Sequence, residues 1–151
     1  MAKHEADSAI ELRARALRLL ARREHSRQEL GRKLAPHAET EEALQALLSA
    51  LQEKKQLSDE RFASERARVL SRKYGAARIR QDLKARGIDA ALVGGISSEG
   101  EFERARAILE RKYREPAATR EERAKRMRFL QGRGFSGEVV RRLLNDRLDD
   151  E

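Results

Sequence analysis

The chain has 151 residues, of which 40% are charged and 4% aromatic, and it carries a net charge of +8. This length suits one domain or a short array of small units, and a composition rich in Ala, Leu, Glu, Lys and Arg favours helices. Disulfides, thiolate metal sites and a cysteine nucleophile are excluded because cysteine is absent, and no apolar run approaches the roughly 20 residues of a membrane span.

Residues 1–57 predict a first set of three helices. The opening MAKHEADSAIELRARAL lacks the apolar core and cleavage site of a signal peptide, so we expect a cytoplasmic protein. Ser26 and Glu29 have the spacing of a capping box, Thr40 precedes a further helical stretch, and Pro36 marks the joint between the two. The apolar stripe expected to form the core contains Leu12, Ala16, Leu19, Leu20, Leu30, Leu34, Leu44, Leu47, Leu48 and Leu51.

Residues 58–98 predict a second set of three helices. Ser58 precedes DERFASERARVL, and Gly75 separates this stretch from AARIRQDL. Arg66 falls on the apolar stripe, where its stem can lie along the core, and we expect its head to pair with a carboxylate of a neighbouring helix. The predicted core residues of this set are Phe62, Val69, Leu70, Ile79, Leu83, Leu92, Val93 and Ile96.

Residues 99–151 predict a third set, with helices reaching to about residue 148. Thr119 and Glu122 form another capping box, which follows a longer polar link around Pro116. Arg106 stands on the stripe as Arg66 does, with the same expected ion pair. The predicted core residues are Phe102, Leu109, Tyr113, Met127, Leu130, Val139, Val140, Leu143 and Leu144.

One eleven-residue pattern occurs twice, as LKARGIDAALV at residues 83–93 and LQGRGFSGEVV at residues 130–140. In each copy an arginine lies in the last turn of a helix, where its positive charge is favoured by the negative end of the helix dipole. The following glycine can adopt the left-handed backbone conformation that is common just past a helix end. An apolar residue then packs back onto both helices, and Asp or Ser caps the next helix. The pattern predicts a tight helix–turn–helix corner, and its recurrence indicates an array of helical repeats.

The excess positive charge lies entirely in the later part of the chain. Residues 1–60 hold 11 basic and 11 acidic residues, whereas residues 61–151 hold 23 and 15. Between Arg66 and Arg86 there are eight basic residues and one acid, Asp82. Because the excess of basic residues is concentrated in one segment, it favours a polyanion or an acidic protein surface as the partner. Arginine is, however, also common on solvated helical faces.

Several of these stretches together resemble the RecX family of recombination regulators. LSDERFASERARVLSRKYGAARIRQDLKARGI and the later RMRFLQGRGFS carry the resemblance, and ALRLLARREHSRQELGRKL is similar to that family's first repeat. The resemblance implies an all-α protein of three tandem three-helix repeats that form an elongated, curved array. It also implies binding to the RecA filament on single-stranded DNA. The resemblance further implies that the protein inhibits the ATP hydrolysis, strand exchange and co-protease activity of RecA. It would do so by blocking filament extension or by promoting filament disassembly.

For this function the candidate contact residues are basic side chains on the expected wet faces of the second and third sets. They would pair with acidic patches of RecA or with phosphates of the enclosed strand. We expect a monomer that uses no cofactor and no metal. The candidates are Arg68, Arg72, Lys73, Arg78, Lys84, Arg86, Arg126, Arg128, Arg133, Arg141 and Arg142.

Two other classes of function stay open on the residues alone. A direct binder of single- or double-stranded DNA could place a corner helix in the major groove and neutralise phosphates, although few aromatic residues are available for base stacking. An enzyme has little support, because His4, His25 and His37 are scattered and no glycine-rich phosphate loop is present. We therefore predict a protein that is not an enzyme.

Overall fold

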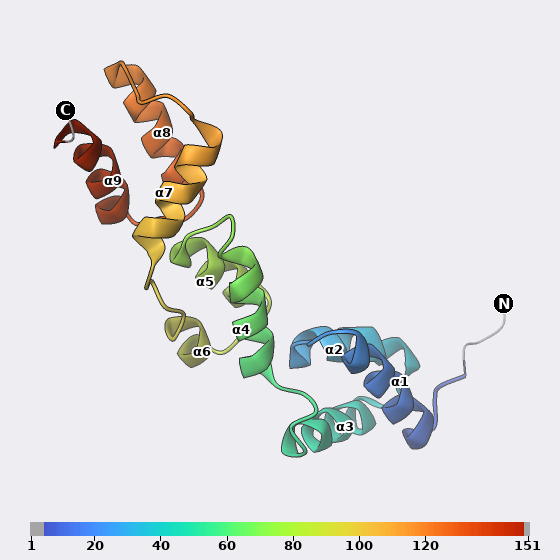
Figure 1. The fold of residues 1–151 in the computed structure, drawn as a ribbon. Helices are drawn as coiled ribbons and strands as arrows, with labels where there is room; N and C mark the ends of the chain where they lie inside the picture. The colour runs from blue at the N-terminus through green and yellow to red at the C-terminus, as the bar shows by residue number, and fades with distance from the viewer. Residues whose placement is uncertain (1–4, 150–151) are drawn as a thin grey trace. The chain divides into compact units, whose positions relative to one another are not determined.

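The computed structural model describes residues 5–149, and all regular secondary structure in this range is helical (Figure 1). The predicted all-α class is confirmed, with three sets of three α-helices in chain order. No helix in the described range is long and apolar enough to cross a bilayer. The elements are α1 (Ala9–Arg22), α2 (Arg27–Leu34), the 3₁₀ helix η1 (Ala35–His37), α3 (Glu41–Glu53), α4 (Asp59–Leu70), α5 (Ala76–Ala85), α6 (Ala90–Gly94), α7 (Glu101–Lys112), α8 (Arg120–Gly132) and α9 (Gly137–Asp149).

The chain divides into two compact units, and the second set of helices contributes to both. Unit 1 runs to Glu65 and includes Arg86–Ile88, while unit 2 contains Arg66–Ala85 and the chain from Asp89 onward. Each unit has a core cluster of its own. In unit 1 it consists of Leu12, Ala16, Leu30, Leu34, Leu44, Leu48, Leu51 and Leu57, and in unit 2 of Ala105, Ile108, Leu109, Leu130, Phe135, Val140, Leu143 and Leu144.

Most of the predicted stripe residues are buried or half-buried, but Val69 is not core. Val69 is 46% exposed and lies on the surface of α4, three residues along the helix from Arg66. There the Arg66 guanidinium pairs with Asp82 of α5 at 2.9 Å, which confirms the ion pair expected for this arginine. The matching expectation for Arg106 is wrong, because its partner Glu110 lies one turn along the same helix.

Both Arg-Gly corners have the predicted conformation. Gly134 has φ 89°, Phe135 is 4% exposed, and the Ser136 hydroxyl accepts a hydrogen bond from the Val139 N–H at 3.2 Å. Only glycine adopts such a left-handed φ without strain, so the residue type follows from the turn. The copy in the second set has the same positive φ, buried apolar residue and side-chain cap, at Gly87, Ile88 and Asp89.

The third-set corner also joins the last two sets, because it docks on the first turn of α5. The Gly75 N–H donates to the Arg133 carbonyl at 2.8 Å, and the Ala77 N–H donates to the Gly134 carbonyl at 3.3 Å. The first N–H groups of a helix have no partner within the helix, so the corner satisfies donors that would otherwise be orphaned. The two backbones touch at the glycines, since a Cβ on Gly75 would lie 2.6 Å from the carbonyl carbon of Gly134.

A carboxylate from the next set completes each joint. Glu101, the first residue of α7, is 5% exposed and accepts a hydrogen bond from the Ala76 N–H at 3.3 Å. Asp59, the first residue of α4, accepts from the Arg27 N–H of α2 at 2.7 Å, and the corner at Gly87 lies against that same helix. A negative group is favoured at the positive end of a helix. The repeated corner is therefore a connector between successive three-helix sets.

Candidate functional site

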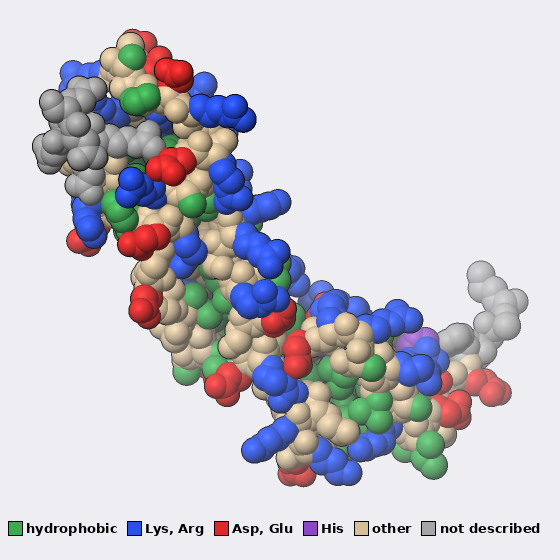
Figure 2. All heavy atoms as spheres, viewed as in Figure 1, with side chains coloured by type: hydrophobic (Ala, Val, Ile, Leu, Met, Phe, Trp, Pro, Cys, Tyr) green, Lys and Arg blue, Asp and Glu red, His purple; other side chains and the backbone are tan. Residues whose placement is uncertain are grey.

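Most of the predicted basic residues lie in unit 2 and point into solvent. Two are half-buried: Arg133 in the third-set corner and Arg86, which belongs to unit 1. Figure 2 shows Lys and Arg side chains close together along the edge of unit 2 that carries the α4–α5 link and α7. The exposed candidates are Arg68, Arg72, Lys73, Arg78, Lys84, Arg128, Arg141 and Arg142.

Arg126 is placed differently from the prediction. Its residue exposure is 6%, so it does not belong to a wet face. Its guanidinium carbon lies 4.4 Å from the centroid of the Tyr113 ring, and its Nη1 has no hydrogen-bond partner within the described part of the chain. The helical pattern misplaced this residue because a long arginine can cover an aromatic ring while occupying an interior position.

The tripeptide Arg-Lys-Tyr occurs just after α4, as residues 72–74, and at the end of α7, as residues 111–113. The Arg and Lys of the two copies border one cavity of about 490 Å³, which is completed by the end of α8. We call it the RKY cavity. Its lining consists of Arg72, Lys73, Ile108, Arg111, Lys112, Phe129 and Arg133.

The positive charge of the RKY cavity is not compensated locally. No carboxylate is among the residues that line it, and none of its five cations forms an ion pair with any residue between 5 and 145. Three helix C-termini, those of α4, α7 and α8, adjoin it and favour cations nearby. Each helix end carries only about half a negative elementary charge, so most of the positive charge remains available to a ligand.

Aromatic rings hold several of these cations in place. The Lys112 ammonium lies 4.0 Å from the centroid of Phe129, and the Arg133 guanidinium lies 5.2 Å from the same ring. Arg133 also lies 5.4 Å from the Tyr74 ring, whose other contact is the Arg78 guanidinium at 4.9 Å. A cation resting on an aromatic face loses less freedom when it binds an anion, because its position is already restricted.

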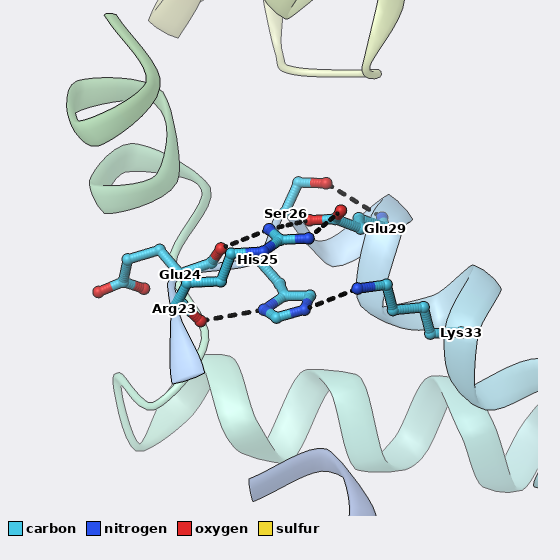
Figure 3. A network of polar contacts seen from close by, with 6 residues as sticks. All are labelled: Arg23, Glu24, His25, Ser26, Glu29 and Lys33. Atoms are coloured by element: carbon cyan, nitrogen blue, oxygen red, sulfur yellow. Dashed lines mark hydrogen bonds and ion pairs between the residues drawn. The ribbon is translucent and has the colours of Figure 1, made fainter. Parts of the chain in front are cut away.

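The equivalent link in the first set, between α1 and α2, is neutralised instead (Figure 3). Arg23 pairs with Glu29 at 2.7 Å, and this hydrogen bond lowers the pKa of Glu29 to about 2. The buried His25 donates from Nδ1 to the Arg23 carbonyl and accepts at Nε2 from Lys33. Burial, together with the charges of Arg23 and Lys33, lowers the pKa of His25, so the ring is held neutral.

The structure thus brings together only some of the predicted residues. Arg72, Lys73 and Arg133 line the RKY cavity, whereas the remaining candidates do not, and Arg142 instead covers the Phe102 ring at 4.8 Å. Sequence reasoning missed Arg111, Lys112 and Phe129, although the repeated Arg-Lys-Tyr could have identified the first two. Within the described residues no cluster of His, Asp or Glu could hold a metal ion.

Comparison with known proteins identifies the family. Models of the first, second and third three-helix domains of RecX match residues 13–49, 58–94 and 99–144, in that order. The chain belongs to the RecX family. Among its relatives, the regulatory protein RecX of Herbaspirillum seropedicae is 44% identical over 135 residues, covering 87% of this chain and 88% of the relative. That of Neisseria meningitidis serogroup B is 42% identical over 141 residues, covering 92% of each chain.

Solved RecX structures share the fold of this RecX-family chain. The crystal structure of RecX from Lactobacillus salivarius matches with a TM-score of 0.80 and 18% identity, covering 91% of this chain and 95% of that one. A second crystal structure of a regulatory protein RecX matches with a TM-score of 0.74 and 22% identity, covering 91% and 73%. At these identities the likeness concerns the fold alone. The curated relatives, in contrast, are named as regulatory proteins.

Proposed function

We propose that this RecX-family chain binds the RecA filament on single-stranded DNA and inhibits its recombinase, ATPase and co-protease activities. It acts by blocking filament extension or by promoting disassembly, as a cytoplasmic monomer without a catalytic group or cofactor. The observation that carries the proposal is the ordered match to all three RecX domains across residues 13–144. The partner itself follows from the resemblance to RecX regulators.

The distribution of charge in unit 2 supports a nucleoprotein partner. Exposed cations occur on α5, α8 and α9, and the RKY cavity adds four exposed cations and the half-buried Arg133, without a carboxylate among its lining residues. Such a surface attracts phosphates and acidic protein patches, both of which a protein–DNA filament presents. No chemistry is needed for this role, because binding that differs between filament states is sufficient to shift an equilibrium.

The test is the single-stranded-DNA-dependent ATPase of RecA from the same organism, titrated with this protein after filaments have formed. We expect the rate to fall at protein concentrations well below that of RecA, since capping or disassembly needs fewer molecules than RecA subunits. The double variant Lys84→Glu with Arg128→Glu removes exposed cations outside the cavity and will weaken inhibition. The matched pair Arg18→Glu with Arg32→Glu, exposed in unit 1, will leave inhibition unchanged.

A second candidate function is direct nucleic-acid binding without RecA, which the cationic, aromatic-containing cavity favours. An undiminished ATPase rate, together with salt-sensitive DNA binding in a control without RecA, would support this alternative and refute filament regulation.

A further inference from the structure

We propose that the RKY cavity is a binding site for the sugar–phosphate backbone of a single nucleic-acid strand. The site deepens the proposed function, and its biological setting rests on that function, because the strand inside a RecA filament is such a ligand. The binding site itself rests on the charge, shape and lining of the cavity in unit 2.

The lining selects an anion with several charged oxygens. Five cations from three segments face one space, and the chain offers them neither carboxylates in the lining nor ion pairs among its described residues. The Arg111 guanidinium makes only a long contact of 3.5 Å to the Arg72 carbonyl, so most of its donors stay available. Guanidinium groups match phosphate oxygens with paired donors, and the two lysines add compact charges.

The size and floor of the cavity favour a single strand over a duplex. The space of about 490 Å³ is open to solvent and admits a group of nucleotide size. Ile108 and Phe129 form an apolar floor on which a sugar or base can pack, while the phosphate meets the cations at the rim. A flexible single strand can present these parts separately, because its backbone bends and its bases are unstacked.

The repeat pattern gives an independent reason to read this cavity as a ligand site. Both Arg-Lys-Tyr copies lie where the chain leaves the first helix of their set, yet the first set has Arg23, Glu24 and His25 in the corresponding link. There the arginine is paired with Glu29, and Glu24 is paired with Arg61. The fold therefore does not require uncompensated cations at this position, and their presence in two sets calls for an external counter-charge.

The test is fluorescence anisotropy with a labelled oligothymidylate, without RecA, over a series of salt concentrations. The variant Arg111→Gln with Lys112→Gln removes two cavity cations, and the matched control Arg120→Gln with Lys125→Gln removes two exposed cations from α8 outside the cavity. Neutralising a phosphate contact of a single strand contributes about 0.7 to the salt slope. We expect the cavity variant to bind about 25-fold more weakly at about 0.1 M salt, with a slope smaller by about 1.4.

Unchanged affinity and slope in the cavity variant would overturn the proposal, and so would an equal loss in the control, which would indicate diffuse attraction. Equal binding of a duplex of the same length, or displacement of the oligonucleotide by equimolar tripolyphosphate, would overturn the assignment to a single strand. Circular dichroism and tyrosine fluorescence must match the parent protein, so that a folding defect is excluded.

The RecA assay separates this proposal from the proposed function. A cavity variant that keeps oligonucleotide binding but loses inhibition would place RecA itself in the cavity, which overturns the site while leaving filament regulation intact. A parent protein that binds the oligonucleotide through the cavity but does not inhibit RecA would support the site and refute filament regulation.

Discussion

The joint between the last two three-helix sets depends on Gly75 and can be tested by one methyl group. A Cβ at this position would lie 2.6 Å from the Gly134 carbonyl carbon and 2.7 Å from the Phe135 nitrogen. Both are backbone atoms, so no side-chain rotation can relieve the clash. Ordinary contact begins at 3.4 Å, and the corner must therefore retreat by about 1 Å in Gly75→Ala.

The cost follows from what that retreat breaks. Two hydrogen bonds join the segments, from Gly75 to the Arg133 carbonyl at 2.8 Å and from Ala77 to the Gly134 carbonyl at 3.3 Å. Each contributes about 1 kcal/mol, and strain in a well-packed contact adds about 1–3 kcal/mol. Phe135, which is 4% exposed, must shift with the corner. We expect Gly75→Ala to lower the free energy of unfolding of unit 2 by about 3–5 kcal/mol, the sum of these contributions.

Urea unfolding followed by tyrosine fluorescence measures this loss in unit 2 alone. Tyr74 and Tyr113 are the only tyrosines, both lie in unit 2, and the chain has no tryptophan. The control Gly132→Ala adds the same methyl at the end of α8, where nothing lies within 4 Å, and should be neutral or stabilising by up to about 1 kcal/mol. Equal midpoints for Gly75→Ala and the parent protein would refute the close-contact joint.

Three further predictions concern single residues. The folded chain lowers the pKa of His25, so unit 1 will lose stability as the pH falls below 6.5. Thermal melts followed by circular dichroism will show this loss of stability, and the variant His25→Gln will not show it. Lys55 has φ 60°, so Lys55→Gly should stabilise unit 1 by about 1 kcal/mol in urea. Arg126→Met should leave the free energy of unfolding of unit 2 unchanged or raise it, as measured by urea unfolding with tyrosine fluorescence. A loss above about 2 kcal/mol would instead show that a negative group pairs with Arg126.

The fold was largely predictable because its signals are local. Capping residues such as Ser26 and Thr119 start their helices as expected, and the glycines of the two corners have the positive φ that the pattern indicates. What the sequence could not provide is the partner of each corner. The hydrogen bond from Ala76 to the buried Glu101 joins residues 25 positions apart, and neither residue type specifies the other. Long-range pairing of this kind depends on packing between sets.

The site was less predictable than the fold because helical periodicity does not determine how far a long side chain reaches. Arg126 was expected on a wet face and is buried against Tyr113, while Lys112 from α7 and Arg133 from the corner after α8 both rest on Phe129. The low aromatic content argues only against base stacking on a single strand. The fold instead gathers both tyrosines and one phenylalanine around the same cations.

The corner that joins the sets also helps to build the candidate site. Gly134 permits the close approach that lets the Arg133 carbonyl accept the Gly75 N–H, and the same approach sets the Arg133 guanidinium between the rings of Tyr74 and Phe129. The corner at Gly87 makes the corresponding joint on α2, where the neighbouring link is neutralised by Glu29 and the uncharged His25. The same corner therefore occurs twice, but only the second copy places a cation in a cavity whose positive charge is uncompensated. Loosening the joint with Gly75→Ala should accordingly weaken oligonucleotide binding as well as stability, because the fold and the cavity share the same contact.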